Sequence, residues 1–355
     1  MALNIVDILK RAVDSGAADV FIVAGTNACA RINGEIRLLT EERLMPDDTL
    51  HLVSGIYRMA GGRSMADYEK SGDDDFSFAI AGLSRFRVSA YMQRGSCAAT
   101  IRVISFELPD PEQLGIPEEV IRLGELRDGM VLVTGPAGSG KSTTLACIID
   151  HINSTRSVNI ITLEDPIEFL HSHKKSIVSQ REMAVDSENY VTALRATLRL
   201  SPDVILLGEM RDFETISVAM TAAETGHFLM STLHTIGAAN TINRIIDVFP
   251  ANQQRQVAVQ LSMVLDAVVS QQLVPTIDGG LTPVFEFMKV TPAIKNMIRE
   301  NKIAQIDAAI QGGRESGSLT NDGGLFNLVK SGRITSETAL QYASDPKIMK
   351  RRLQL

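Results

Sequence analysis

A glycine-rich loop near the middle of the chain constrains the fold more than any other stretch. It runs from Gly135 to Ser142 with the sequence Gly-Pro-Ala-Gly-Ser-Gly-Lys-Ser, and Thr143 follows it. The apolar run 130–133 before the loop predicts a buried strand, and the spaced apolar residues at 145–149 predict a helix after it. A strand, this loop and a helix in that order are typical of a P-loop, which holds the phosphates of a nucleotide.

The residue types in this loop suit a phosphate group. Its glycines permit backbone conformations in which successive N–H groups turn inward around an anion, and the helix behind it adds a positive N-terminal end. Lys141 would contact the β and γ phosphates, and the Ser142 hydroxyl would coordinate Mg²⁺. We therefore expect ATP and Mg²⁺ as cofactors. The predicted contacts are Gly135, Pro136, Ala137, Gly138, Ser139, Gly140, Lys141, Ser142 and Thr143.

Composition narrows the class of protein. With 355 residues the chain is long enough for about two or three domains. Its net charge of −7 disfavours broad affinity for nucleic acid. No run of about 20 apolar residues occurs, so we expect no membrane span. The three cysteines lack the spacing of a zinc site or a disulfide framework, which fits a reducing cytosol.

The pattern of elements predicts three regions and a linker. Alternating apolar and polar residues at 75–105 indicate a sheet, and residues 46–70 have a helical pattern broken at Gly61-Gly62. Asn33-Gly34 predicts a hairpin turn. Prolines are concentrated in 108–117, which we interpret as the linker after a first domain at 1–107. Strands and helices alternate over 118–275, which is typical of a parallel sheet covered by helices.

The remaining region, 276–355, is expected to be mostly helical. Two strands at 272–274 and 281–289 are predicted to form a short pair before the helices begin. The stretch 311–324 is rich in glycine and serine and predicts a loop, and 336–353 predicts a closing helix.

An acidic residue follows one of the most apolar strands. The run 203–207 ends at Gly208-Glu209, so the strand would deliver the Glu209 carboxylate to the edge of the sheet where open parallel sheets bind ligands. There it can orient or activate the water that attacks the γ phosphate. The alternative is an acid that caps the next helix, for which Asp212 is the better candidate.

Two further strands end in polar residues. Glu164 and Asp165 follow 161–163, and acids at a sheet edge can hold an attacking water; a turn acid is the alternative. His234 follows 231–233 and can donate a hydrogen bond to the γ phosphate; a structural histidine is the alternative. Since all three strands are expected in one sheet, we predict Glu209, Glu164 and His234 as catalytic residues.

Taken in order, these motifs resemble the secretion ATPase superfamily, and within it the type IV pilus retraction ATPases. The P-loop resembles the family's Walker A motif, with Ala137 in place of a threonine. Residues 161–169, 204–209 and 226–234 resemble its acidic box, Walker B motif and histidine box. Residues 292–300 resemble a C-terminal motif associated with retraction, although Lys295 replaces an arginine there.

This resemblance implies the fold class: an α/β RecA-like P-loop ATPase core with an N-terminal PAS-like α+β domain and a C-terminal mostly helical region. It also implies that N-terminal arginines approach nucleotide phosphates, where a guanidinium stabilises transition-state charge. The candidates are Arg85, Arg87 and Arg94, with Arg102 as a fourth. From alternation alone, a solvated polar face is the alternative for each of them.

The resemblance further implies a hexameric motor that couples ATP hydrolysis to pilus retraction. Its partners would be identical subunits, a platform protein of the inner membrane and a second retraction ATPase. The protein would lie in the cytoplasm against the inner face of the membrane. An accessory retraction ATPase, a RecA-like nucleic-acid motor and a non-hydrolysing P-loop scaffold are the alternatives. The acidic balance and low aromatic content of 5% disfavour the nucleic-acid motor.

Overall fold

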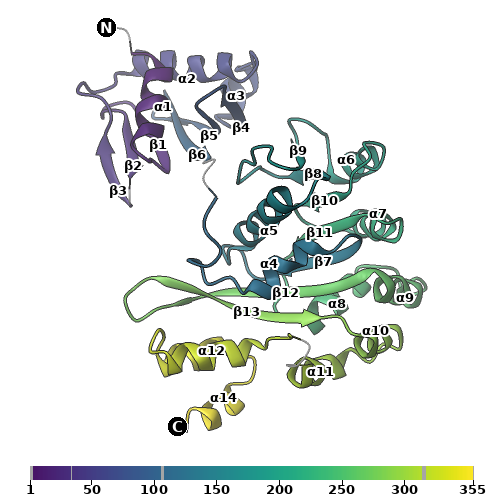
Figure 1. Ribbon diagram of the computed structural model, residues 1–355. Coiled ribbons are helices and arrows are strands. Elements are labelled where there is room, and N and C mark those ends of the chain that lie inside the picture. Colours follow the sequence, from purple (N-terminus) through teal and green to yellow (C-terminus); the bar gives the residue numbers. More distant parts are fainter. Residues whose placement is uncertain (1–2, 33, 105–107, 314–316, 355) are drawn as a thin grey trace. The chain divides into compact units, whose positions relative to one another are not determined.

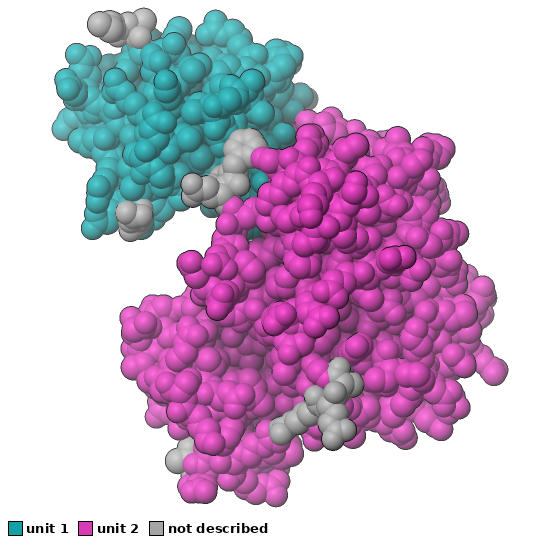
Figure 2. Space-filling model, viewed as in Figure 1, with its two compact units in different colours: residues 1–107, 168–170 teal, residues 108–167, 171–355 magenta. Residues whose placement is uncertain are grey.

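A computed structural model describes residues 3–32, 34–104, 108–313 and 317–354. The chain divides into two compact units, which Figure 2 shows in different colours. Unit 1 comprises residues 1–107 together with 168–170, and unit 2 comprises residues 108–167 together with 171–355. Within the part of the chain that is described, no helix combines the length and apolar character needed to cross a bilayer.

Unit 1 is an α+β unit built on a six-stranded antiparallel sheet with the order β3-β2-β1-β6-β5-β4. Its strands are β1 (Asp19–Ile22), β2 (Cys29–Ile32), β3 (Glu35–Leu38), β4 (Asp73–Ile80), β5 (Ser84–Gln93) and β6 (Ser96–Ile104). Its helices are α1 (Ile5–Asp14), α2 (Pro46–Met59) and α3 (Ala66–Ser71). The PAS-like assignment of this unit stays a prediction from the resemblance.

One face of this sheet carries the core of unit 1. Phe86 and Val88 of β5 are fully buried with Ile56 and Tyr57 of α2. The residues between them on β5 face the other way and are more exposed, as the alternation in the sequence predicts. The predicted hairpin is present as the antiparallel pair β2–β3, although Asn33 in its turn lies outside the described residues.

Unit 2 is built on a seven-stranded sheet with the order β13-β12-β7-β11-β10-β8-β9 (Figure 1). All of its strand pairs are parallel except β12–β13. The strands are β7 (Gly129–Thr134), β8 (Asn159–Glu164), β9 (Ile177–Glu182), β10 (Val204–Leu207), β11 (Phe228–Leu233), β12 (Leu265–Pro275) and β13 (Leu281–Lys289).

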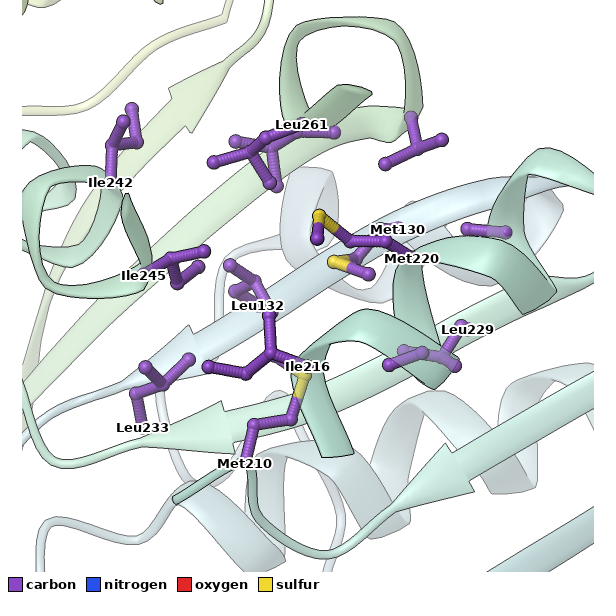
Figure 3. Packing of buried hydrophobic residues seen from close by; sticks show 14 of the residues in the cluster. Met130, Leu132, Met210, Ile216, Met220, Leu229, Leu233, Ile242, Ile245 and Leu261 are labelled. Carbon is purple, nitrogen blue, oxygen red and sulfur yellow. The ribbon is translucent and has the colours of Figure 1, made fainter. Parts of the chain in front are cut away.

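Helices cover both faces of this sheet, which explains why its central strands are continuously apolar. On one face, α5 (Lys141–Thr155) packs with α4 (Glu118–Ile121). On the other face lie α6 (Tyr190–Thr197), α7 (Phe213–Glu224), α8 (Ala238–Asp247) and α9 (Gln254–Val264). Figure 3 shows this second core, where Leu132 and Leu229 of the sheet meet Ile216, Ile245 and Leu261 of the helices.

The end of the predicted core differs from the expectation. The strand pair predicted at 272–274 and 281–289 is present, because β12 pairs antiparallel with β13. However, β12 begins at Leu265 and also pairs with β7 over Leu265–Ser270, so the pair extends the central sheet past residue 275, where the core was expected to end. The first strand was predicted too short: β12 has 11 residues and follows helix α9 directly.

Helices follow β13, as expected, but their bounds differ. They are α10 (Pro292–Arg299), α11 (Ile306–Gly312), α12 (Asn321–Lys330), α13 (Ser336–Tyr342) and α14 (Pro346–Arg352). Part of the loop predicted at 311–324 is helix α12, whose first turn is capped by the Thr320 hydroxyl. The single closing helix is instead two helices, because Pro346 disfavours helical backbone at Asp345, which caps α14.

Candidate functional site: a phosphate loop and three strand ends

The predicted phosphate loop connects β7 to α5, as the sequence indicated. Gly135, Gly138 and Gly140 have φ values of 143°, 74° and 86°, a region of backbone space that favours glycine. Pro136, Ala137 and Gly138 form the exposed rim of the loop. Lys141 is the first residue of α5, and Ser142 and Thr143 follow in its first turn. All nine predicted contacts therefore lie in one loop and one helical turn.

Lys141 folds back over this loop. Its side chain is buried, and Nζ donates hydrogen bonds to the backbone oxygens of Gly135 at 3.0 Å and Pro136 at 2.9 Å. Ser139 is also buried, and its Oγ has no hydrogen-bond partner among the described residues. A buried polar atom without a partner is costly in a loop that has no polar ligand. The positive ammonium, the orphaned hydroxyl and the helix N-terminus therefore suit an anionic group such as a phosphate.

Glu209 and His234 come together at the neighbouring strand ends. β10 and β11 are adjacent and parallel, so the residues after Leu207 and Leu233 meet at one edge. Glu209 accepts from Arg211 Nε at 2.7 Å, and His234 Nε2 lies 3.5 Å from its other carboxylate oxygen. The Glu209 side chain is largely buried, with 14% exposed, whereas that of His234 is 55% exposed.

The turn that carries Glu209 is fixed from both neighbouring strands. Gly208 donates its N–H to the Leu163 oxygen at 2.7 Å, and its own oxygen accepts from Thr232 Oγ1 at 2.6 Å. Met210 donates its N–H to the Thr232 oxygen at 3.2 Å. The helix-capping role considered for Glu209 belongs to Asp212, which accepts from the Thr215 N–H at 2.8 Å.

Glu164 lies at the end of β8, on the other side of β10. One of its oxygens accepts from Thr162 Oγ1 at 2.5 Å and from Gln180 Nε2 at 3.2 Å. Tyr190, at the start of α6, lies near both carboxylates. Burial raises the pKa of its hydroxyl, and the negative charges of Glu209, Asp165 and Glu164 also raise it. The strand ends therefore form one acidic edge beside the phosphate loop.

Sequence reasoning missed Tyr190 and Arg211. Arg211 stands two residues after Glu209, and a cation that close to a predicted carboxylate was the signal available for it. Tyr190 had no such signal, because it reaches the acidic edge from a separate helix and only the fold places it there.

Comparison with known proteins shows which family this chain resembles. A model of the family described as type II/IV secretion system protein matches residues 2–316. The type IV pilus retraction ATPase PilT of Pseudomonas aeruginosa is 43% identical over 97% of this chain and 99% of its own length. A crystal structure of the pilus retraction motor PilT with bound ADP superposes with a TM-score of 0.88 at 45% identity, covering 98% of this chain and 99% of that one.

The chain belongs to the type II/IV secretion system protein family. The resemblance stated from the sequence is thereby confirmed, and so is the RecA-like class of the core. The chain is also 38% identical to the type IV pilus ATPase PilU of Pseudomonas aeruginosa, over 95% of this chain and 87% of that protein. The chain is therefore similar both to the retraction ATPase PilT and to the pilus ATPase PilU.

The arginines predicted to approach the nucleotide phosphates all lie in unit 1. Arg85 and Arg87 project from β5, and Arg94 stands in the turn before β6 with a positive φ of 51°. Arg102 on β6 binds Asp19 through its Nε at 3.1 Å. These four arginines lie in unit 1, whereas the phosphate loop and Glu209 lie in unit 2.

The Mg²⁺ predicted from the sequence would be bound with the nucleotide, with Ser142 as its protein ligand. Among the described residues, no group of three or more His, Cys, Asp or Glu side chains could hold a metal ion. Mg²⁺ commonly binds through phosphate oxygens, water and one or two protein oxygens. Ser142 in the first turn of α5 offers such an oxygen beside the loop.

Proposed function

We propose that this chain is the ATP-hydrolysing subunit of a motor that retracts type IV pili. The observation that carries the proposal is the meeting of the phosphate loop with Glu209, Glu164 and His234 at one edge of a parallel sheet. The near-full-length likeness to PilT, a pilus retraction ATPase, supports the biological role.

In this proposal the loop holds ATP and the acidic edge activates water. The backbone of residues 135–143 and Lys141 bind the phosphates, and Ser142 contributes an oxygen to Mg²⁺. Mg²⁺ neutralises charge on the phosphates when bound. Glu209 accepts the hydrogen bond that orients the attacking water, with Glu164 assisting on the adjacent strand.

Arg211 and His234 both lie against the Glu209 carboxylate. Arg211 Nε, at 2.7 Å, orients one of its oxygens, and His234 Nε2 lies 3.5 Å from the other. His234 is exposed enough to turn from Glu209 toward a γ phosphate, so it can report whether that phosphate is present. The N-terminal arginines Arg85, Arg87 and Arg94 supply positive charge to the transferring phosphate, in keeping with the family resemblance.

The family resemblance also implies a larger assembly. We propose a homohexamer at the cytoplasmic face of the inner membrane, which acts on a platform protein of the pilus base and works with a second retraction ATPase. Similarity to PilU makes an accessory retraction ATPase the second candidate function. Neither role requires nucleic acid.

Two measurements test the proposal. Purified protein should hydrolyse ATP in a Mg²⁺-dependent reaction, and single-stranded DNA should not stimulate it. Deletion of the gene should leave cells with persistent, non-retracting pili by microscopy. Loss of all pili would contradict a retraction role, and ATP binding without hydrolysis above a Glu209→Gln control would favour a scaffold. Retraction that survives deletion but weakens under load would favour the accessory role.

A further inference from the structure

Gln271 stands behind the phosphate loop on strand β12, which pairs with β7. Its side chain is buried, with 3% of the residue exposed. Its Oε1 accepts a hydrogen bond from Thr144 Oγ1 at 2.7 Å, and Thr144 is fully buried in the first turn of α5. A buried amide and a buried hydroxyl thus satisfy each other across 127 positions of the chain.

The same residue fills the space beside two glycines of the loop. A Cβ placed on Gly140 would lie 2.8 Å from Gln271 Nε2, and one placed on Gly135 would lie 2.1 Å from the Gln271 backbone oxygen. Nothing lies within 4 Å of a Cβ placed on Gly138. Two of the three glycines therefore face Gln271, in addition to having positive φ angles.

The residues on either side of Gln271 contact other elements. Ser270 Oγ accepts from the Gly237 N–H at 2.9 Å, beyond the strand end that carries His234. Gln272 Nε2 donates to Asn321 Oδ1 at 3.1 Å, at the start of α12. Because side chains alternate along a strand, Gln271 faces α5 while its two neighbours face away from it. Gln272 is therefore a control of identical residue type on the opposite face.

We propose that Gln271 is a positioning residue that holds the phosphate loop in its nucleotide-binding shape. The inference rests on the proposed function of that loop. A loop with three glycines has many accessible backbone conformations, so fixing one of them before binding lowers the entropic cost of taking up a nucleotide. Gln271 supplies that constraint through the Thr144 hydrogen bond at the helix start and through close packing at Gly135 and Gly140.

The first test replaces Gln271 with leucine, which has similar volume and no amide. Gln271→Leu leaves the Thr144 hydroxyl buried without an acceptor, so we expect the KM for ATP and the Kd for ADP to rise about tenfold. The kcat should fall by no more than about threefold, since no group that touches the reacting atoms is removed. Gln272→Leu should leave both constants unchanged. Equal constants in the two variants, with both folded by circular dichroism, would overturn the proposal.

The second test approaches the same hydrogen bond from its other end and remains decisive if Gln271→Leu does not fold. Thr144→Val removes the donor and should raise the Kd for ADP by about tenfold, whereas Thr144→Ser keeps the hydroxyl and should restore it. The double variant Thr144→Val with Gln271→Leu should bind no more weakly than either single variant. Thr144→Val binding as tightly as Thr144→Ser would contradict the proposal.

These readouts separate the two proposals. If the wild-type protein binds ADP but shows no ATPase activity, the proposed function fails, and the ADP affinities of the variants still decide the role of Gln271. If the wild-type protein hydrolyses ATP and Gln271→Leu matches it in KM and Kd, the proposed function stands and the positioning role fails.

Discussion

Strand β5 of unit 1 alternates buried positions with more exposed ones, whereas β7 and β11 of unit 2 are buried at every position. The first pattern belongs to an antiparallel sheet with its core on one face, and the second to a parallel sheet covered on both faces. In β5, polar side chains such as Arg87 and Ser89 occupy the alternate, exposed positions along the middle of the strand. In unit 2, Glu164, Glu209 and His234 stand where their strands end.

This difference explains where chemistry can be assembled. A sheet covered on both faces leaves its carboxyl edge as the place for polar groups, so neighbouring strands deliver them to one line. A sheet with an open face spreads polar groups over an area, and neighbouring side chains there pair with one another, as Arg102 does with Asp19. Unit 2 therefore concentrates its candidate catalytic residues, and unit 1 does not.

The largest expected effect tests the burial pattern itself. Ile205→Ala and Leu206→Ala, at successive positions of β10, should each lower the free energy of unfolding by about 2–5 kcal/mol, because both are buried. On β5, Val88→Ala should cost stability, while the neighbouring Ser89→Ala should change it by only about 0.5 kcal/mol. Urea denaturation of the four variants measures this. An unchanged free energy of unfolding in either β10 variant would contradict the conclusion that the sheet of unit 2 is covered on both faces.

Next in size is the loss of the lysine in the loop. Lys141→Ala removes the ammonium that lies over the phosphate loop, so nucleotide affinity should fall by about a hundredfold. Lys175→Ala, an exposed lysine of the same unit, is the control and should bind ADP as the wild type does. Calorimetric titration with ADP measures both. An unchanged affinity in Lys141→Ala would exclude this loop as the nucleotide site.

The next prediction concerns the effect of each unit 1 arginine on ATPase activity. Arg102→Ala should keep ATPase activity within about twofold of the wild type, because its guanidinium is already paired with Asp19. At least one of Arg85→Ala, Arg87→Ala and Arg94→Ala should lower kcat by about tenfold or more. Steady-state ATPase assays decide the ranking. The opposite order, with Arg102→Ala the most impaired, would contradict this ranking.

The smallest effect concerns two thiols. Burial, together with the negative charges of Asp150 and Asp110, raises the pKa of Cys147 in α5 to about 11, so its neutral form is favoured in the folded state. This preference stabilises the fold below the usual thiol pKa and is lost as pH rises from that value toward 11. Iodoacetamide at about pH 8.5 should therefore label the partly exposed Cys97 of unit 1 at least tenfold faster. Mass spectrometry of the native protein gives the two rates, and equal rates would contradict the burial of Cys147.

The sequence allowed the central strands to be predicted because β7, β8, β10 and β11 are short, continuous apolar runs. It did not predict β9 (Ile177–Glu182), which lies at the edge of the sheet and in which four of six residues are polar. It predicted β13 and the end of β12, but not that β12 begins at Leu265 and joins the central sheet through its pairing with β7. Local pattern identifies a strand more readily than it identifies the neighbour of that strand.

The residues of the candidate site also fall into those that the sequence predicted and those that it could not. Glu209, Glu164 and His234 could be predicted because each follows an apolar strand, and the parallel topology then brings strand ends together. Gln271 and Tyr190 could not, because nothing in their own stretches of sequence shows that they lie against Thr144 or Gly208. Supporting residues of this kind are defined by contacts between distant segments, which only the folded chain reveals.

The central claim is that the carboxylate at the end of β10 activates water beside the phosphate loop, and Glu209→Gln tests it most directly. The substitution keeps the shape of the side chain and removes its basicity, so kcat for Mg²⁺-dependent ATP hydrolysis should fall by about a hundredfold or more. The Kd for ADP should stay within about twofold of the wild type, because Glu209 is not proposed to bind the phosphates. A variant that hydrolyses ATP within a few-fold of the wild-type rate would contradict the account.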